Sequence, residues 1–135
     1  MRAKGEFDVR LVPQSPEDKT EGSTLGRMSI DKQYRGDLVA TGKGEMLTAA
    51  TAIQGSAGYV AIERVDGTLD GRGGSFVLQH SGTLDRGEPR LSITIVPDSG
   101  TGALSGAVGT MTIEITGGKH FYEIEYTLPG SSDSE

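Results

Sequence analysis

Residues 67–78 read GTLDGRGGSFVL, and residues 102–113 repeat their pattern as GALSGAVGTMTI. Both stretches share the frame Gly-x-Leu-x-Gly-x-x-Gly and then continue into alternating apolar residues. Glycine is used where a backbone takes a positive φ or passes close to another segment. A glycine corner that twice leads into a strand predicts a sheet that bends sharply at matching places, as the wall of a small barrel does. A dinucleotide-binding loop is disfavoured, because a helix follows such a loop.

The rest of the chain indicates an all-β domain. Apolar and polar residues alternate with a period of two, and sustained helical periodicity is absent. Closure of antiparallel strands into a barrel is favoured, because it leaves no strand edge exposed. The predicted fold is an eight-stranded antiparallel closed barrel over residues 1–128, followed by a flexible tail over residues 129–135. The eight strands are expected near residues 4–12, 25–34, 37–47, 57–65, 75–84, 90–96, 110–116 and 120–128.

Two segments between the predicted strands carry no strand pattern. Residues 13–23 form a polar stretch with nothing to bury, which predicts a loop. Residues 48–56 are rich in alanine, and the sequence leaves open whether they form a short helical turn or an irregular segment.

Composition limits the partners that the protein is expected to have. The formal net charge is −6 with scattered positive residues, which argues against nucleic acid and against anionic membranes. There is no cysteine and there are only two histidines, so we predict no metal site and no cofactor. No apolar run has the length of a membrane helix, and the first residues lack the apolar segment of a signal peptide. These features predict a soluble cytoplasmic protein.

Three stretches of the chain resemble a known family. They are GYVAIE at residues 58–63, FVLQHSG at 76–82 and VPDSGTG at 96–102. Together they are similar to an uncharacterised bacterial family catalogued as domain of unknown function 3224, and the likeness extends over residues 4–128. The resemblance implies an eight-stranded barrel of the allene oxide cyclase type and brings no biochemical activity with it. Barrels of that shape include cyclases and proteins that direct the stereochemistry of a reactive apolar molecule, but this is an analogy of fold alone.

The interior of the predicted barrel is the expected place for function, because eight strands leave room for one small ligand. His80 is in phase with Phe76 and Leu78, and Tyr122 is in phase with Tyr126 on the last predicted strand. If these side chains point inward together, they form an apolar pocket with a few polar groups, as ligand sites do. Two alternatives stay open: His80 as a hydrogen-bonded core residue, and the tyrosines as core residues that reach the barrel ends.

The register between the two central predicted strands decides where Glu63 points. With Glu63 opposite Val77, the apolar residues of both strands share one face, and we favour this register. Glu63 then faces solvent or a subunit interface, where Arg27 or Arg64 could pair with it. The other register places Glu63 beside His80 as an acid/base pair inside the cavity.

These features lead to three hypotheses for function. In the first, the protein binds a small apolar molecule in the barrel interior, oriented by His80, Tyr122 and Tyr126. In the second, it is an isomerase, cyclase or epoxide-opening enzyme, with Glu63, His80 and Tyr59 as candidate catalytic residues. In the third, the barrel is filled and acts as a structural or interaction module.

The outer face of the barrel carries one further prediction. Val77 lies opposite Phe76 and Leu78 along its strand, so that strand is apolar on both faces. An apolar outer strip favours a cover, either residues 48–56 or another subunit. We therefore predict a homo-oligomer, a dimer or a trimer as the barrel relatives suggest.

Overall fold

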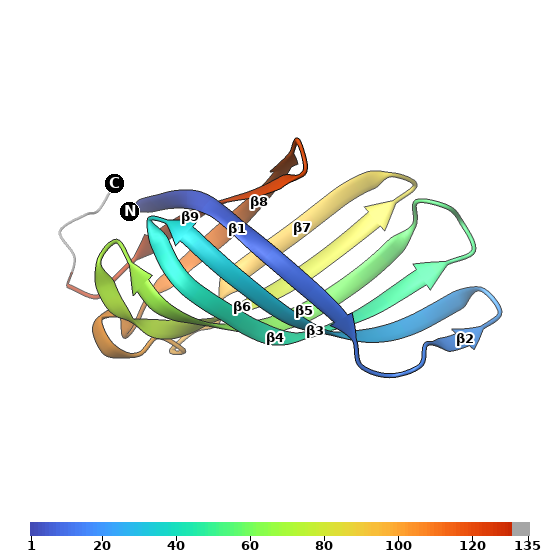
Figure 1. The fold of residues 1–135 in the computed structure, drawn as a ribbon, viewed down its shortest axis with the longest axis horizontal. Coiled ribbons are helices and arrows are strands. Elements are labelled where there is room, and N and C mark those ends of the chain that lie inside the picture. Colours follow the sequence, from blue (N-terminus) through green and yellow to red (C-terminus); the bar gives the residue numbers. More distant parts are fainter. Residues whose placement is uncertain (131–135) are drawn as a thin grey trace.

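A computed structural model describes residues 1–130 as a closed antiparallel β-barrel (Figure 1). In this part of the chain, eight strands form the barrel, and pairing of β1 with β3 closes it. The short strand β2 pairs with β3 outside the closed wall. The strands are β1 (Arg2–Pro13), β2 (Asp18–Thr20), β3 (Ser23–Gly36), β4 (Leu38–Thr51), β5 (Ala57–Leu69), β6 (Arg72–Asp85), β7 (Glu88–Ile95), β8 (Val108–Thr116) and β9 (Lys119–Thr127), and a 3₁₀ turn, η1 (Gly102–Leu104), lies between β7 and β8.

The predicted all-β barrel is confirmed, and the predicted segments differ from the strands in detail. Within the predicted polar loop of residues 13–23, Asp18–Thr20 forms the extra strand β2. Residues 48–51 continue β4, and the turn to β5 occupies only residues 52–56, without a helix. Of the predicted flexible tail, residues 131–135 lie outside the described residues.

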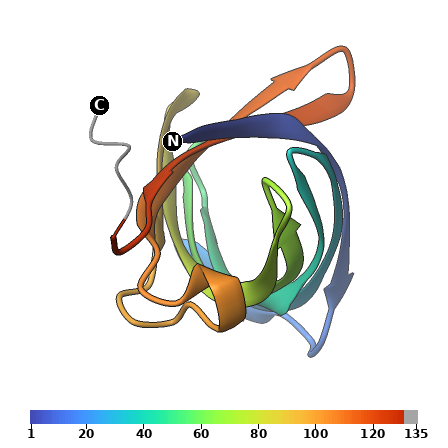
Figure 2. The same ribbon diagram turned by 90° about the vertical axis from the view of Figure 1, so that its left-hand side faces the viewer.

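The two glycine-rich stretches both lead into a strand, but they form different turns. In the first, Asp70 and Gly71 have φ angles of 51° and 80° and make a two-residue turn between β5 and β6. The second contains η1 and belongs to the longer connection from β7 to β8. The two stretches also pack together: a Cβ on Gly102 would lie 2.8 Å from the Gly73 carbonyl oxygen. They therefore close one end of the barrel jointly rather than bending the wall at two equivalent places (Figure 2).

Side chains fill the half of the barrel next to this end. Leu104 of η1 and nearby Ala107 are buried there with Phe76, Leu78 and the other members of one apolar core. Two tyrosines of β9 stabilise this half through hydrogen bonds of their hydroxyl groups. The Tyr122 hydroxyl accepts a hydrogen bond from Leu38 N at 2.8 Å and donates to the Arg35 carbonyl at 2.9 Å, and the Tyr126 hydroxyl donates to the Asp70 carboxylate.

The register of β5 and β6 is the one that the sequence disfavours, so our favoured register was wrong. Glu63 lies opposite Leu78, and Ala61 lies opposite His80. The cause is the two-residue turn, which pairs Leu69 with Arg72 and thereby sets every later pair. Glu63 is therefore buried inside the barrel, while its neighbour Ile62 is 52% exposed on the outside.

Candidate functional site

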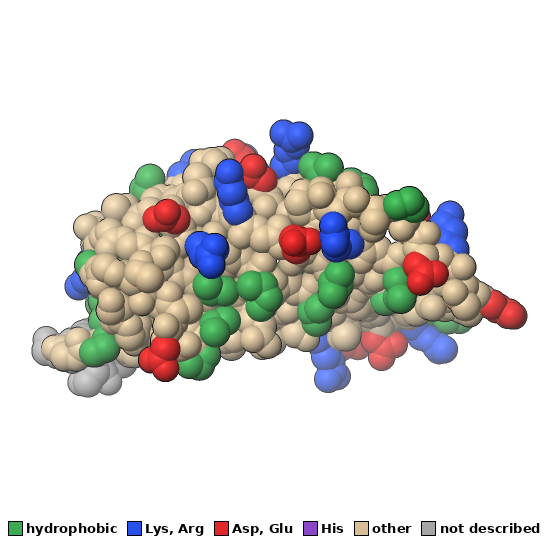
Figure 3. Space-filling view, turned by 90° about the horizontal axis from the view of Figure 1, so that it is seen from below, with side chains coloured by type: hydrophobic (Ala, Val, Ile, Leu, Met, Phe, Trp, Pro, Cys, Tyr) green, Lys and Arg blue, Asp and Glu red, His purple; other side chains and the backbone are tan. Residues whose placement is uncertain are grey.

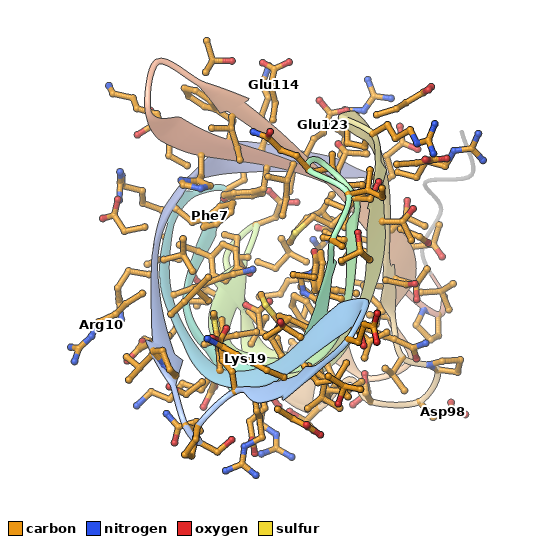
Figure 4. All side chains as sticks on the ribbon, turned by 90° about the vertical axis from the view of Figure 1, so that its right-hand side faces the viewer. Phe7, Arg10, Lys19, Asp98, Glu114 and Glu123 are labelled. Carbon is orange, nitrogen blue, oxygen red and sulfur yellow. The ribbon has the colours of Figure 1, made fainter. Side chains whose placement is uncertain are left out.

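The other half of the barrel holds a cavity of about 550 Å³. Its walls are mainly apolar and come from side chains such as Val9, Ile30, Met46, Ala61 and Leu91. Figure 4 looks at the end where the cavity opens; Phe7 of β1 points into the barrel and Arg10 of the same strand points away from it. Lys32 and His80 are polar residues that line the inner part of this space.

A group of four buried polar side chains, the Glu63 cluster, lies at the inner end of the cavity. Glu63 has no exposed surface, and its Oε1 atom is 2.9 Å from His80 Nε2 and 3.0 Å from Lys32 Nζ. Its Oε2 atom accepts a hydrogen bond of 2.5 Å from the Tyr34 hydroxyl. Lys32 and Tyr34 are two residues apart on β3, so both point inward, while Glu63 comes from β5 and His80 from β6.

The surroundings of Glu63 keep its carboxyl group charged. Burial by itself acts to raise the pKa, but the hydrogen bond with His80 and the charge of Lys32 act against it. With the further hydrogen bond from Tyr34, these contacts hold the pKa of Glu63 below its ordinary value of 4.5. Burial, followed by the negative charge of Glu63, raises the pKa of Tyr34 well above 10, so Tyr34 remains a hydroxyl donor.

Aromatic rings complete the environment of the Lys32 ammonium group. Its Nζ atom lies 4.9 Å from the centre of the Phe7 ring and 5.7 Å from that of Tyr34. Such contacts stabilise a cation that is removed from water. The charges of Lys32 and Glu63 balance each other, which a pair of buried ions requires.

Two glycines of β4 let β5 approach closely, and one of them makes room for the Glu63 carboxylate. A Cβ on Gly42 would lie 2.0 Å from Glu63 Oε2, and one on Gly44 would lie 1.9 Å from the Ile62 carbonyl oxygen. Any larger residue at Gly42 would therefore occupy the place that the carboxylate takes. Glycine is required at position 42 because the Glu63 carboxylate needs the space, and not because the backbone turns there.

The structure brings together some of the predicted site residues and separates others. His80 and Tyr59 line the cavity, and Glu63 forms a hydrogen bond with His80 on the side of the ring that faces away from the cavity. Phe76, Leu78, Tyr122 and Tyr126 are instead packed in the filled half and do not line the cavity. A ligand in this cavity would therefore not contact these four side chains.

The expected partner of Glu63 also differs. Arg27, one of the two arginines suggested for it, pairs with Glu45 at 3.3 Å. The buried partner is Lys32, which sequence reasoning missed together with Tyr34 and Gly42. The signal that could have found them is the Asp70-Gly71 pair, a typical two-residue hairpin turn, because it fixes the register that turns Glu63 inward.

These features define a class of protein: a closed antiparallel barrel with one filled half, one open half and a buried charged cluster between them. The chain belongs to the family described as protein of unknown function (DUF3224), whose model matches residues 3–126. It is similar to the crystal structure of a protein with unknown function from that family in Shewanella oneidensis. The two chains are 49% identical with a TM-score of 0.92, over 97% of this chain and 98% of that one. No curated protein matches the chain.

The described residues contain neither a metal-binding cluster nor a helix that could span a membrane. Residues 1–130 hold no group of three or more His, Cys, Asp or Glu side chains placed to bind a metal ion. In the same part of the chain, no helix has the length and apolar character needed to cross a membrane.

The role of Gly42 gives a first prediction. Gly42→Ala lowers the free energy of unfolding by about 1–3 kcal/mol, because the added methyl group displaces the Glu63 carboxylate from its donors. Urea denaturation measures the change. Gly73→Ala is the matched control: a Cβ there meets nothing within 4 Å, so its effect stays within about 0.5 kcal/mol. Equal effects of the two substitutions would contradict this role of Gly42.

Proposed function

We propose that the protein binds one small, largely apolar molecule in the open half of the barrel. The supporting observation is a cavity of about 550 Å³ with mainly apolar walls and with His80 and Lys32 at its inner end. Ligand sites in proteins have this size and this combination of apolar walls and few polar groups. In this proposal the apolar body of the ligand lies against the walls and its polar end meets His80.

The open half of the barrel speaks against the third hypothesis, a filled barrel that acts only through its outer surface. A natural core is packed densely with few voids larger than a water molecule, so a cavity of several hundred Å³ is not expected in a barrel that acts only through its surface. The filled half already supplies the apolar core and the hydroxyl anchors of Tyr122 and Tyr126. The open half is therefore available for a ligand.

A second candidate function is catalysis on the bound molecule, as an isomerase, cyclase or epoxide-opening enzyme. The specific observation in its favour is the distance of 2.9 Å between Glu63 and His80, an acid/base pair within hydrogen-bond reach. In this case His80, which lines the cavity, would exchange a proton with the substrate, and Glu63 would be a positioning residue behind it. Tyr59 also lines the cavity, and burial followed by the charge of Glu63 raises its pKa.

We propose in addition that the barrels associate through their outer face. Leu47 and Val60 are direct cross-strand neighbours there, and they are 56% and 51% exposed. Ile62, two residues further along β5, adds to this apolar surface. Figure 3 shows hydrophobic side chains gathered on one face of the molecule among charged ones. Exposed apolar patches of this kind often serve in protein association.

The binding proposal predicts that a neutral apolar dye, N-phenylnaphthylamine, enters the barrel and increases in fluorescence. Ala61→Phe places a ring in the cavity and lowers the affinity for the dye at least about tenfold, because the ring takes the ligand's space. Val60→Phe, one residue away on the outer face, is the matched control and leaves the affinity unchanged. Absence of dye binding, or equal affinity in the two variants, would contradict the proposal.

A further inference from the structure

The hydrogen bonds of the Glu63 cluster determine which nitrogen of His80 carries the proton. The Lys32 ammonium group is buried and can only donate, so Glu63 must be the carboxylate that balances its charge. A carboxylate accepts hydrogen bonds and cannot donate them. His80 Nε2 therefore donates to Glu63, and because Lys32 already balances the charge of Glu63, the ring needs no positive charge and Nδ1 is left as an acceptor.

This acceptor is open to the cavity. Nδ1 has no hydrogen-bond partner among the described residues. Every fully buried side-chain nitrogen or oxygen of residues 1–130 has a hydrogen-bond partner. Nδ1 has none, so part of its surface must be accessible. Because His80 lines the cavity, the open nitrogen faces the place that a ligand would take.

The Lys32 ammonium group lies on the Glu63 side of the His80 ring. Nζ and His80 Nε2 contact the same oxygen of Glu63, and Nζ uses one of its three donors for this bond. Nδ1 is on the side of the ring away from Glu63, so a group bonded to Nδ1 lies in the cavity and out of hydrogen-bond reach of Lys32 Nζ. A ligand group that donates a hydrogen bond is therefore what His80 Nδ1 requires.

We propose that the polar end of the ligand is a hydroxyl group, carried by an apolar alcohol or phenol. The hydroxyl donates its proton to His80 Nδ1 in a hydrogen bond. A carboxylate fits this place poorly, because it offers no proton to Nδ1 and adds a second negative charge beside Glu63. The inference rests on the proposed function and specifies the substrate class of the same site.

The test compares three ligands with the same apolar body at neutral pH: para-octylphenol, para-octylanisole and para-octylbenzoate. Their affinities are measured by displacement of N-phenylnaphthylamine. The phenol binds about fivefold tighter than the anisole, which accepts but cannot donate, and the benzoate binds weakest. An anisole that binds as well as the phenol, or a benzoate that binds best, overturns the inference while the cavity proposal stands. Absence of binding by the dye and by all three ligands overturns the proposed function itself.

Two variants assign the preference to His80. In His80→Phe the phenol and the anisole bind equally, because the acceptor is gone. In the control His120→Phe, which alters another residue that lines the cavity, the preference for the phenol remains. Nitrogen NMR of the wild-type histidines provides a check that requires no variant. It finds the proton of His80 on Nε2, and a proton on Nδ1 instead would overturn the inference.

An independent observation concerns the wall of the barrel between β7 and β8. In the described chain, their ladder consists of two pairs, Ile93 with Met111 and Thr94 with Thr110. Beyond these pairs the β8–β9 hairpin diverges from β7, as the side view in Figure 1 and the end view in Figure 2 show. We call the gap between residues 88–92 and residues 112–116 the slot. Residues on both sides of the slot line the cavity, among them Leu91 and Ile113.

The slot extends inward to the level of the Glu63 cluster, because Ile93 lies opposite His80. Its edge is also protected against pairing with a further strand. Asp85 and Glu88 flank the two-residue turn between β6 and β7, and such a flanking pair is hydrogen-bonded. Because hydrogen-bonded and non-hydrogen-bonded pairs alternate, the next residue, Pro89, has its nitrogen directed away from β6 and toward the slot. A proline nitrogen cannot donate to another strand.

From this geometry we infer that the slot, which is continuous with the open end of the barrel, is the part of the entrance through which the ligand passes, and that the β8–β9 hairpin swings toward β7 to narrow it. Ser92 and Thr112 face outward and would stand opposite each other if the ladder continued. Because the chain has no cysteine, the double variant Ser92→Cys/Thr112→Cys introduces a single disulfide that holds the slot closed.

Stopped-flow fluorescence then measures the rate at which N-phenylnaphthylamine binds. Oxidation of the double variant slows binding at least about tenfold, and a thiol reductant restores the rate. The control Ser81→Cys/Ser92→Cys joins two residues that already pair in the β6–β7 ladder, and its rate does not change on oxidation. An unchanged rate in the oxidised slot variant overturns passage through the slot. Failure of its cysteines to join overturns the closing motion.

Discussion

A carboxylate that is fully buried must receive hydrogen bonds and a balancing charge from the protein, and the inner surface of this barrel is arranged around that need at Glu63. Lys32 supplies the charge, while Tyr34 and His80 supply further donors. Gly42 leaves the space that the carboxylate occupies. These residues come from four neighbouring strands, β3 to β6, so the cluster also fixes how those strands face one another.

The cluster divides the barrel into two parts with different physical roles. On one side, the apolar core, η1 and the hydroxyl anchors of β9 stabilise the fold. On the other side, apolar walls surround space that no side chain fills. A rigid filled half can hold His80 in a defined orientation for a ligand in the open half, since groups locked by packing and hydrogen bonds are the ones that bind with defined geometry.

The sequence predicts the barrel well because alternation with a period of two is a direct consequence of strand geometry. It predicts the site less well, since an inward face was identified by its apolar residues. On β5 that criterion fails: Val60 and Ile62 are about half exposed, and Glu63 is buried. The polar side chains of the Glu63 cluster form their hydrogen bonds with one another and come from different strands. The residue pattern of any one strand therefore does not reveal these hydrogen bonds. The Asp70-Gly71 turn is the local feature that specifies the correct register, and the repeated glycine frame around it obscures this signal.

The charge of Glu63 is the central claim of this account, and carbon NMR of its carboxyl group during a pH titration tests it most directly. Because the pKa is lowered in the folded state, the cluster stabilises the fold above the ordinary value of 4.5 and loses this contribution as the pH falls through the folded pKa. The account predicts a carboxylate signal that persists below pH 4.5 while the barrel remains folded. A Glu63 that takes up its proton above that value would contradict it.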